Sequence, residues 1–384
     1  MNRDNCDAHW MEVALELAKR GQGWVEPNPM VGCVVVRAGE LIASGFHEHF
    51  GGPHAEVHAL RGLGAEVLSE STVYVTLEPC AHHGKTPPCV ELLCSKPPYR
   101  VVVAMEDPFE KVAGLGISRL RQQGIDVTIG VLEEQARALN APYLKRLASG
   151  LPWVIAKWAM TLDGAIATGS GDSKWISNAL SRQQVHRMRA RVDAILVGSS
   201  TVLADDPWLT ARLGPDERIA RRALRVVLDR RFRIGLESRL VQSAKQIPVL
   251  VVVDSQSIRG LAGKRQAFQE AGVEFLELEQ SLAIDSQAGL ERILREIADR
   301  GGSNVLVEGG AEVFGSLFDA RLVDQVECYI GPKLVGGRDA RRAVFGLGVS
   351  EISRGFGFEN ASWESLEGDL HFSGILARCP SERP

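Results

Sequence analysis

The sequence lacks the features that would place it in a membrane or outside the cell. No apolar run approaches the ~20 residues that a membrane-spanning helix needs. The first residues, Met-Asn-Arg-Asp-Asn-Cys-Asp, have no apolar signal-peptide core. The 7 cysteines are scattered and odd in number, which argues against a dense disulfide framework and indicates reduced thiols. We therefore expect a cytoplasmic protein with no membrane partner.

The sequence also lacks an excess of positive charge. Its 44 Lys and Arg residues are outnumbered by 48 Asp and Glu residues, and the two signs are interspersed. An enzyme that follows a nucleic-acid backbone needs a basic face, so we expect a small-molecule partner and no nucleic acid. Binding one phosphorylated metabolite needs only a few local cations. No low-complexity tract, no repeat and no Gly-x-Gly-x-x-Gly fingerprint of a Rossmann unit is present.

The length and the pattern of apolar residues indicate two α/β domains. A chain of 384 residues is too long for one ordinary core. Its 45% hydrophobic and 24% charged residues are typical of a globular protein. Strand-like and helix-like segments alternate, with a break at Ser149-Gly150 and Pro152. We predict domains over residues 1–150 and 151–384, each a three-layer α/β/α sandwich, the first with a mixed sheet and the second with a mostly parallel sheet.

The expected elements follow from the periodicity of the apolar residues. In the first domain we predict helices to about residue 20 and at 54–63, near 90 and at 117–123, with strands at 31–37, 41–45, 72–77, 100–104 and 127–129. In the second we predict strands at 153–157, 194–197, 225–228, 249–253, 273–276 and 304–307, with helices at 181–191, 261–271 and 290–300. Segments 325–330 and 363–377 are predicted as an antiparallel addition to this sheet.

Three short motifs in the first domain combine into a predicted zinc site. His54-Ala-Glu56, Pro79-Cys80 and Pro88-Cys89 supply one imidazole, two thiolates and one carboxylate that is not a ligand. Three protein ligands leave the fourth zinc position to water, as in hydrolytic sites, whereas structural sites usually have four protein ligands. Zinc lowers the pKa of such a water to about 7. The pattern predicts hydrolytic loss of ammonia from an amidine-like carbon, with Glu56 as the catalytic proton carrier.

The prolines before His54, Cys80 and Cys89 are typical of helix starts. If both cysteines open helices, the exposed amides and helix dipoles would favour thiolate over thiol. His82 and His83 lie between the cysteines and are rival ligands. We favour the interpretation that they are polar loop residues near the substrate.

This ligand set resembles that of the cytidine-deaminase-like superfamily, with the longer interval Ala81 to Pro88 between the cysteines. With Asn28-Pro-Met-Val-Gly32 and Gly45-Phe-His47, it is similar to the deaminase half of the bifunctional riboflavin biosynthesis family. The resemblance implies a diaminopyrimidinone substrate that carries ribose 5-phosphate. The implied substrate contacts are Asn28 at the pyrimidine edge, His47 beside it, and His82 and Lys85 at the phosphate.

Five segments of the second domain resemble the reductase half of the same family: 157–164, 173–176, 201–212, 308–311 and 332–337. The resemblance implies a dihydrofolate-reductase-like fold that uses NADPH to reduce the ribose to a ribityl chain. The implied cofactor contacts are Ala159, Trp175, Thr201, Asp205, Gly310, Ala311, Glu312, Val313, Phe314, Gly315 and Ser316. The implied substrate contacts are Lys157, Ser173, Arg189, Leu209, Arg212 and Glu308. The guanidinium groups of Arg189 and Arg212 can each donate two parallel hydrogen bonds to a phosphate. Lys157 and Asp205 are both candidate proton donors.

The chain departs from the family pattern at three places. Thr161 stands where the family usually has Ser, and the hydroxyl is retained. Asp107-Pro-Phe-Glu110 replaces the usual Asp-Pro-Asn-Pro, which leaves the role of this loop open. Arg230 and Arg231 stand after Asp229, where many relatives have Asp-Ser. We hypothesise that Arg230 pairs with the 2′-phosphate of NADPH.

Two other functions share some of these features. A deaminase of tRNA or of free nucleotides with an appended reductase-like module would use the same zinc chemistry, but for tRNA it needs a basic surface, and its cysteines are normally closer. A non-catalytic zinc-stabilised scaffold would not need Glu56. We expect a bifunctional enzyme in which zinc-dependent deamination precedes NADPH-dependent reduction. The oligomeric state stays open, with a homo-oligomer as one option.

Overall fold

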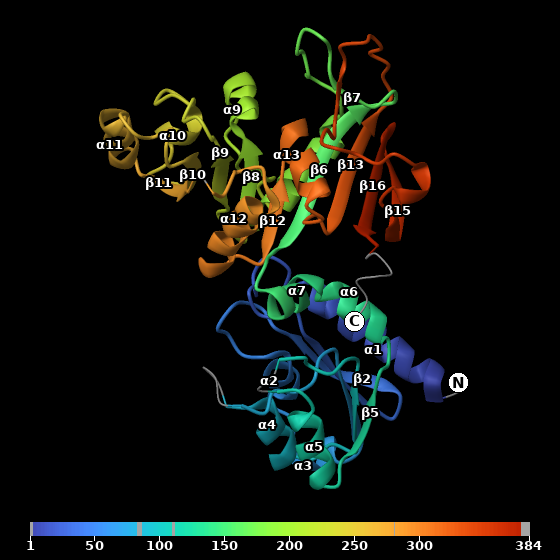
Figure 1. Cartoon of the computed structure of the whole chain (residues 1–384). Coiled ribbons are helices and arrows are strands. Elements are labelled where there is room, and N and C mark those ends of the chain that lie inside the picture. Colours follow the sequence, from blue (N-terminus) through green and yellow to red (C-terminus); the bar gives the residue numbers. More distant parts are fainter. Residues whose placement is uncertain (1–2, 83–86, 110–111, 280, 378–384) are drawn as a thin grey trace. The chain divides into compact units, whose positions relative to one another are not determined.

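The computed structural model describes residues 3–82, 87–109, 112–279 and 281–377. The chain divides into two compact units, Met1–Gly150 and Leu151–Pro384 (Figure 1). Gly150 ends the last helix of the first unit with a left-handed φ of 68°. A residue without Cβ adopts this conformation without strain, so the glycine stops the helix at the boundary.

The first unit contains a five-stranded mixed sheet in the order β2-β1-β3-β4-β5. β1 pairs antiparallel with β2 and β3, while β3, β4 and β5 are parallel. The described elements are helices α1 (Arg3–Lys19), α2 (Ala55–Leu60), α3 (Ala65–Leu68), α4 (Cys89–Ser95), α5 (Leu115–Gln122), α6 (Glu133–Leu139) and α7 (Ala141–Ser149), and strands β1 (Gly32–Arg37), β2 (Glu40–Phe46), β3 (Ser71–Val75), β4 (Arg100–Val103) and β5 (Asp126–Ile129).

Alternating side chains of the sheet enter two separate cores. Val35 and Val73 pack on one face with residues of α2, α4 and α5. Val34 and Val102 pack on the other face with residues of α1 and α6. Because successive side chains of a strand point to opposite faces, both faces are apolar and both are covered by helices. The predicted three-layer arrangement is confirmed.

Gly45 in β2 allows α2 to lie directly against the sheet. A Cβ at this position would lie 2.6 Å from the backbone nitrogen of Ala59 and 2.7 Å from the carbonyl oxygen of Ala55. Only a residue without a side chain permits this approach. The close packing fixes the start of α2, which carries His54 and Glu56.

The second unit contains a nine-stranded sheet in the order β11-β10-β9-β8-β12-β6-β13-β16-β15, and β14 pairs with β7 beside it. The described elements are strands β6 (Trp153–Thr161), β7 (Ala165–Ala167), β8 (Ala194–Gly198), β9 (Leu224–Leu228), β10 (Val249–Asp254), β11 (Val273–Leu278), β12 (Asn304–Val307), β13 (Gln325–Gly331), β14 (Arg341–Arg342), β15 (Phe358–Leu366) and β16 (Asp369–Leu376), and helices α8 (Ala179–Arg189), α9 (Ser199–Asp205), α10 (Arg239–Gln242), α11 (Ala262–Glu270), α12 (Gln287–Asp299), α13 (Ala311–Asp319) and η1 (Ile352–Arg354).

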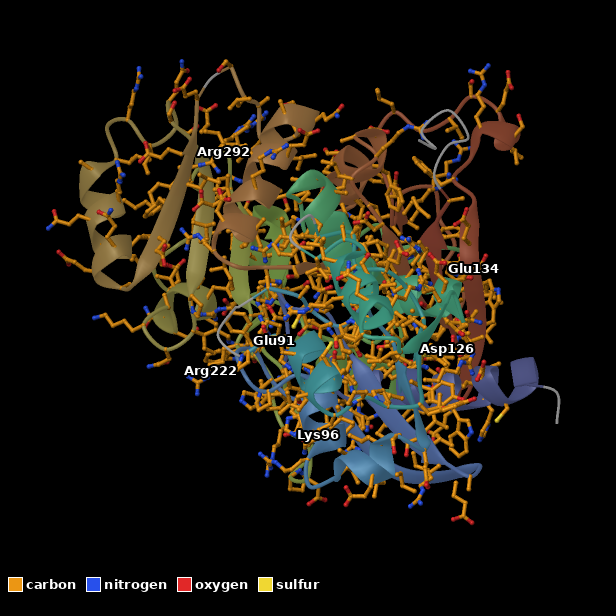
Figure 2. The ribbon with its side chains drawn as sticks, turned by 90° about the horizontal axis from the view of Figure 1, so that it is seen from below. Glu91, Lys96, Asp126, Glu134, Arg222 and Arg292 are labelled. Atoms are coloured by element: carbon orange, nitrogen blue, oxygen red, sulfur yellow. The ribbon has the colours of Figure 1, made fainter. Side chains whose placement is uncertain are left out.

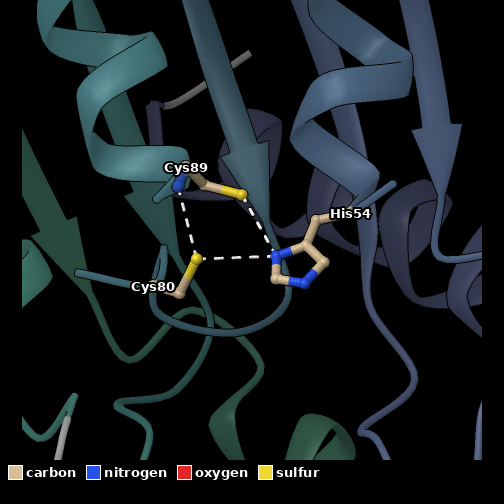
Figure 3. A group of neighbouring side chains, drawn as sticks. All are labelled: His54, Cys80 and Cys89. Carbon is tan, nitrogen blue, oxygen red and sulfur yellow. Dashed lines mark hydrogen bonds between the residues drawn. The ribbon is translucent and has the colours of Figure 1, made fainter. Parts of the chain in front are cut away.

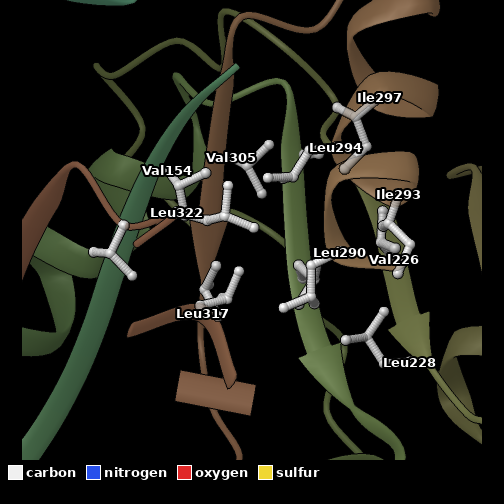
Figure 4. Close-up of a cluster of buried hydrophobic side chains, with 14 of the residues drawn as sticks. Val154, Val226, Leu228, Leu290, Ile293, Leu294, Ile297, Val305, Leu317 and Leu322 are labelled. Carbon is white, nitrogen blue, oxygen red and sulfur yellow. The ribbon is translucent and has the colours of Figure 1, made fainter. Parts of the chain in front are cut away.

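Helices cover both faces of this sheet. On one face, Leu290 and Ile293 of α12 and Leu317 of α13 pack on valines of β6, β9 and β12, as Figure 4 shows. On the other face, Val202 of α9 and Phe268 of α11 belong to a second cluster with residues of β8 and β10. The mostly parallel three-layer architecture is therefore confirmed.

The prediction for the end of the chain was correct only in part. β13 pairs antiparallel with β16, and β16 pairs antiparallel with β15, as predicted, but β13 also pairs parallel to β6 along its whole length. β13 follows α13, so β12, α13 and β13 form another parallel crossover rather than a hairpin. The antiparallel part of the sheet therefore begins at the pairing of β13 with β16 and continues into β15, which the short turn at Glu367-Gly368 joins to β16.

Charges of both signs are distributed over the surface of each unit (Figure 2). Exposed Asp126 and Glu134 in the first unit and Arg222 in the second are examples. Among the described residues, none of the helices is both long enough and apolar enough to span a bilayer.

Candidate active sites

His54, Cys80 and Cys89 come together at one end of the first unit's sheet (Figure 3). The Nδ1 atom of His54 lies 3.5 Å from Sγ of Cys80 and 3.3 Å from Sγ of Cys89. All three candidate ligand atoms lie within 4.8 Å of one another. Within the described residues this is the only such group of histidine, cysteine or acidic side chains.

These separations fit a tetrahedral zinc ion. Zinc lies about 2.3 Å from sulfur and about 2.0 Å from imidazole nitrogen, so two ligands at a tetrahedral angle are about 3.5 Å apart. The distances from Nδ1 of His54 to the two sulfurs agree with this value. One nitrogen and two sulfurs also form a donor set that zinc favours.

Two of the three ligands occupy the predicted helix starts. His54 is the N-cap of α2, and Cys89 is the first residue of α4, directly after Pro88. The expectation that Cys80 also opens a helix is wrong, because Cys80 lies in an irregular segment after β3. Cys80 nevertheless accepts a hydrogen bond from the start of α4, because the backbone N–H of Cys89 donates to its Sγ at 3.2 Å.

The surroundings favour one thiolate even before a metal binds. The hydrogen bond from the Cys89 thiol lowers the pKa of Cys80 to about 4. The same bond, together with burial, raises the pKa of Cys89 well above its usual value. Glu56 is only 3% exposed, and burial raises its pKa. A carboxyl group with a raised pKa beside these ligands suits a residue that both accepts and returns a proton.

A cavity of about 570 Å³ opens onto these residues, and its lining includes His54, Glu56 and Cys80. The predicted substrate residues Asn28, His47 and His82 also line it, whereas Lys85 lies outside the described residues. The side-chain nitrogen of Asn28 lies 3.3 Å from Nε2 of His47, whose Nδ1 lies 3.0 Å from the carbonyl oxygen of Pro53. Burial lowers the pKa of His47, so a neutral ring is favoured near neutral pH.

The departure at Asp107-Pro-Phe proves to be part of this cavity. Asp107 and Phe109 line it together with Tyr143 of α7. The Oδ1 atom of Asp107 accepts hydrogen bonds from the Tyr143 hydroxyl at 2.9 Å and from the Phe109 N–H at 3.0 Å. The Phe109 ring meets the His82 ring edge-on, with centroids 5.8 Å apart. The sequence patterns did not single out Tyr143, because α7 was not among the predicted helices.

The second unit has a larger cavity of about 710 Å³ at the carboxyl ends of β6, β8 and β12. Ligands commonly bind at this edge in open α/β sheets. Most of the predicted reductase residues line it: Lys157, Ala159, Ser173, Trp175, Arg189, Thr201, Asp205, Arg212, Glu308, Gly310, Ala311, Glu312, Val313 and Phe314.

Four predicted residues do not line this cavity: Arg230 and Ser316 line a smaller hollow, and Leu209 and Gly315 line neither space. Leu209 is 3% exposed and belongs to the apolar cluster beneath β8 and β10. Gly315 lies on the buried side of α13, where a Cβ would meet the backbone of Phe345 at 2.4 Å. The helical period explains why the prediction for Gly315 was wrong. Residues 310–316 were all predicted to contact the cofactor, but in a helix some of seven successive residues must face the core.

A buried ion network lies in this cavity. The guanidinium of Arg189 donates to both carboxylate oxygens of Glu308, at 2.5 and 2.7 Å, and Nζ of Lys157 lies 3.8 Å from Glu308. Against the opposing effect of burial, Arg189 and Lys157 lower the pKa of Glu308. Burial lowers the pKa of Lys157. The expectation that Arg189 offers its fork to a phosphate is corrected, because Glu308 already occupies that edge.

Arg212 remains available to an anion. Its Nε and Nη2 atoms lie 3.4 and 3.2 Å from Nε2 of His186, which also lines the cavity. Burial, then Arg189 and Arg212, lower the pKa of His186 to about 4. The ring is therefore neutral at physiological pH and can accept a hydrogen bond from Arg212. His186 was not among the predicted residues, although it lies one helical turn from Arg189.

A smaller hollow of about 240 Å³ adjoins this cavity and shares Gly198, Ser200, Glu312 and Val313 with it. Its lining includes Ser316 and three arginines, Arg230, Arg231 and Arg233. Nη2 of Arg233 donates to the hydroxyls of Ser199 at 2.8 Å and Ser200 at 3.2 Å. Nη1 of Arg230 lies 3.9 Å from the exposed Asp285 carboxylate, a contact that water screens.

Gly309 and Gly310 form the turn into α13 and suit a bound dinucleotide. Their φ angles are 128° and 86°, and a Cβ on Gly309 would lie 3.4 Å from the Thr201 hydroxyl oxygen. The absence of side chains lets a ligand approach the first amides of the helix, which have no partner within the helix. The fit to a phosphate of NADPH is therefore good.

Threonine in place of serine at position 161 retains the hydrogen bond that holds Asp163 against the backbone of Gly336. Its hydroxyl donates to Asp163 at 2.5 Å, and Asp163 accepts from the N–H of Gly336 at 2.7 Å. These bonds lower the pKa of Asp163 to about 2. A serine hydroxyl would supply the same donor.

Comparison with known proteins gives a family match for each of the two units. Residues 4–105 match the cytidine and deoxycytidylate deaminase zinc-binding region, and residues 152–372 match the RibD C-terminal domain. Riboflavin biosynthesis protein RibD of Actinobacillus pleuropneumoniae is 40% identical over 364 residues, covering 95% of this chain and 94% of the relative. That of Escherichia coli K12 is 40% identical over 348 residues, covering 87% and 90%.

Solved structures of such proteins share the whole fold. RibD of Acinetobacter baumannii has a TM-score of 0.82 at 36% identity and covers 98% of this chain and 100% of its own. A deaminase/reductase of Thermotoga maritima gives the same values. A zinc-binding deaminase domain and an NADPH-binding reductase domain are typical of these proteins. The chain belongs to the RibD family and is a bifunctional deaminase and reductase of riboflavin biosynthesis.

Proposed function

We propose that the first unit deaminates 2,5-diamino-6-(5-phosphoribosylamino)pyrimidin-4-one to 5-amino-6-(5-phosphoribosylamino)uracil. The substrate class agrees with the similar Thermotoga maritima protein, a diaminohydroxyphosphoribosylaminopyrimidine deaminase. The observation that carries the proposal is the convergence of His54, Cys80 and Cys89 beside buried Glu56 in one cavity. Zinc held by those three residues would lower the pKa of a coordinated water.

Glu56 does the proton transfers of this reaction. It takes a proton as the water oxygen bonds to the amidine carbon and delivers this proton to the ring nitrogen. It then takes the second proton from the hydroxyl group of the adduct and gives it to the departing amine. The C–N bond breaks, a carbonyl replaces it, and ammonia leaves. Asn28 holds the pyrimidine edge, and its amide is oriented by His47. We assign His82 and Lys85 to the ribose phosphate.

A glutamine at position 56 tests this assignment. E56Q keeps the size of the side chain and a hydrogen-bonding oxygen, but it cannot carry a proton. We expect one zinc per chain and a loss of ammonia release of at least about 10²-fold, the usual contribution of a general base. E134Q, an exposed position of the same unit, is the matched control. Deamination by E56Q at the rate of E134Q would remove Glu56 from this role.

We propose that the second unit reduces the ribosyl group of the deaminated product to a ribityl chain. The turn at Gly309 and Gly310 would hold NADPH, which would supply the hydride. The C1′ carbon of the sugar accepts it, the bond from C1′ to the ring oxygen opens, and that oxygen takes a proton. Arg212 binds the sugar phosphate. Buried Lys157 and Glu308 lie in the same cavity and orient the sugar.

The remaining cofactor contacts follow from the same cavity. We assign Ala159, Trp175, Thr201, Asp205 and residues 310–314 to the nicotinamide and its pyrophosphate, and Ser316 to the adenosine end. Ser173 is assigned to the substrate. Asp205 lies 3.7 Å from Nζ of Lys174 near the cavity mouth, which makes the buried Lys157 the better candidate for contact with the reacting sugar.

Arg230 gives this unit its preference for NADPH over NADH. The arginines of the smaller hollow supply the positive charge that a 2′-phosphate requires. We expect R230A to raise the KM for NADPH by about 10-fold, the equivalent of one lost charge-assisted hydrogen bond, and to leave the KM for NADH unchanged. A preference that stays at the wild-type value would show that Arg230 is not the contact.

The enzyme takes small phosphorylated substrates, and we infer that it works in the cytoplasm. The six described cysteines are all free, and two of them are needed as reduced thiols for zinc.

The mixed surface charge favours a free ribotide over tRNA as substrate. An ammonia-release assay that offers the ribotide and tRNA separately tests this choice.

A further inference from the structure

Glu78 is a buried carboxylate that the reaction scheme above does not use. It is 3% exposed and lies two residues before Cys80, at the end of the segment that follows β3. Within the described residues, its side chain accepts hydrogen bonds from backbone N–H groups. A buried carboxylate that accepts hydrogen bonds from several backbone amides holds that stretch of backbone in one conformation.

Four backbone amides, two from the segment after β4 and two from the first turn of α5, converge on this carboxylate. Oε2 accepts from the N–H of Asp107 at 3.3 Å and of Gly114 at 3.0 Å. Oε1 accepts from the N–H of Gly116 at 2.9 Å and of Ile117 at 3.2 Å. Gly116 and Ile117 lie in the first turn of α5, whose amides have no partner within the helix. One side chain therefore ties together both ends of the segment between β4 and α5.

The same segment is also held against the backbone next to Cys80. The N–H of Glu78 donates to the carbonyl oxygen of Met105 at 3.0 Å. A Cβ on Gly116 would lie 2.1 Å from the carbonyl oxygen of Pro79. The loop and the ligand-bearing segment thus touch on both sides of the carboxylate.

This loop forms a wall of the deaminase cavity. Asp107 and Phe109 line the cavity, and Asp107 is bonded to Tyr143. The Asp107 N–H bond to Glu78 lies within this wall. A shift of the loop would therefore move the wall relative to His54 and Cys80.

We propose that Glu78 is a positioning residue of the deaminase site: its carboxylate sets the distance between the Asp107–Phe109 wall and the zinc-ligand segment. Gln at position 78 keeps one oxygen but replaces the other with an NH₂ group, which cannot accept from two of the four amides. The wall then moves while the three zinc ligands stay in place.

The test compares E78Q with wild type and with E134Q. A misplacement of about 1 Å can cost about 10²-fold in rate. We expect kcat/KM for ammonia release from the diaminopyrimidinone ribotide to fall by about that factor, with a raised KM. We also expect one zinc per chain, an unchanged absorption spectrum of the cobalt-substituted enzyme, and unchanged reduction of the deaminated intermediate by NADPH.

Two results would overturn the proposal. Wild-type kcat and KM in E78Q would show that the wall does not depend on the carboxylate. Loss of zinc, or a changed cobalt spectrum, would show that Glu78 supports the metal ligands instead. If E78Q gives no folded protein, E78D serves, because it keeps the charge but is one methylene too short to reach all four amides. The same kcat/KM and cobalt measurements then decide between the outcomes.

Discussion

His186 shows how neighbouring charges set the state of one side chain. Burial, Arg189 and Arg212 lower the pKa of its imidazole to about 4, whereas the unfolded chain has a pKa of about 6.5. Between these values the unfolded chain binds a proton that the folded chain does not. The free energy of unfolding of the second unit therefore decreases as the pH falls from about 6.5 toward 4, and the penalty is absent above that window.

We predict that H186Q flattens this dependence. Between pH 7.5 and 5, wild type should lose on the order of 1 kcal/mol more of its unfolding free energy than H186Q, a value discounted for the partial exposure of the ring. Urea unfolding of the second unit at the two pH values measures it. Parallel curves for the two proteins would mean that His186 titrates normally.

Individual residues also mark the limit of what the sequence could indicate. His54, Glu56, Cys80 and Cys89 were found from residue type and spacing, because zinc chemistry restricts both. Glu78 was not, because a buried acceptor of backbone amides has no fixed spacing to the loop it holds. Its partners lie up to 39 residues away.

At the scale of elements, the contact between α2 and β2 determines where His54 and Glu56 lie. Gly45 of β2 makes this contact, and α2 lies so close that there is no space for a Cβ at this position. We predict that G45A forces the start of α2 away from the sheet. Overpacking of this kind typically costs about 1–3 kcal/mol.

For G45A we expect a lower midpoint temperature for the thermal unfolding of the first unit, weaker zinc retention and slower deamination. Reduction by NADPH should be unaffected. G263A in α11 is the control, because a Cβ there meets nothing within 4 Å. A G45A variant that holds zinc as tightly as wild type would show that α2 tolerates the displacement.

The elements themselves were largely predictable, and their pairing less so. Apolar periodicity located the strands of both sheets, since buried parallel strands such as β10 are almost wholly apolar. The direction of β13 was not predictable from its own residues. It depends on the pairing with β6, which lies next to β13 in the sheet but about 170 residues earlier in the sequence.

At the scale of the whole molecule, the two activities should separate under metal removal. The candidate ligands lie in residues 1–150, and the described part of residues 151–384 contains no comparable group. We predict that dialysis against dipicolinate abolishes ammonia release, that added zinc restores it, and that NADPH oxidation with the deaminated intermediate continues throughout.

Parallel assays of ammonia and NADPH on one chelated sample provide the measurement. A proportional loss of both activities would indicate that the metal also supports the second unit. The resemblance of the whole chain to RibD proteins made the two functions predictable. The sequence patterns did not reveal the side chains that hold their neighbours in position.

The shared wall of the two hollows in the reductase unit has a consequence for inhibitor design. Gly198, Ser200, Glu312 and Val313 border both spaces. A synthetic compound with a flat head for the larger space and an anionic tail for the arginines would occupy both at once. Once the head is docked, the tail meets its arginines at a high effective concentration, so two weak fragments can combine into one tight ligand.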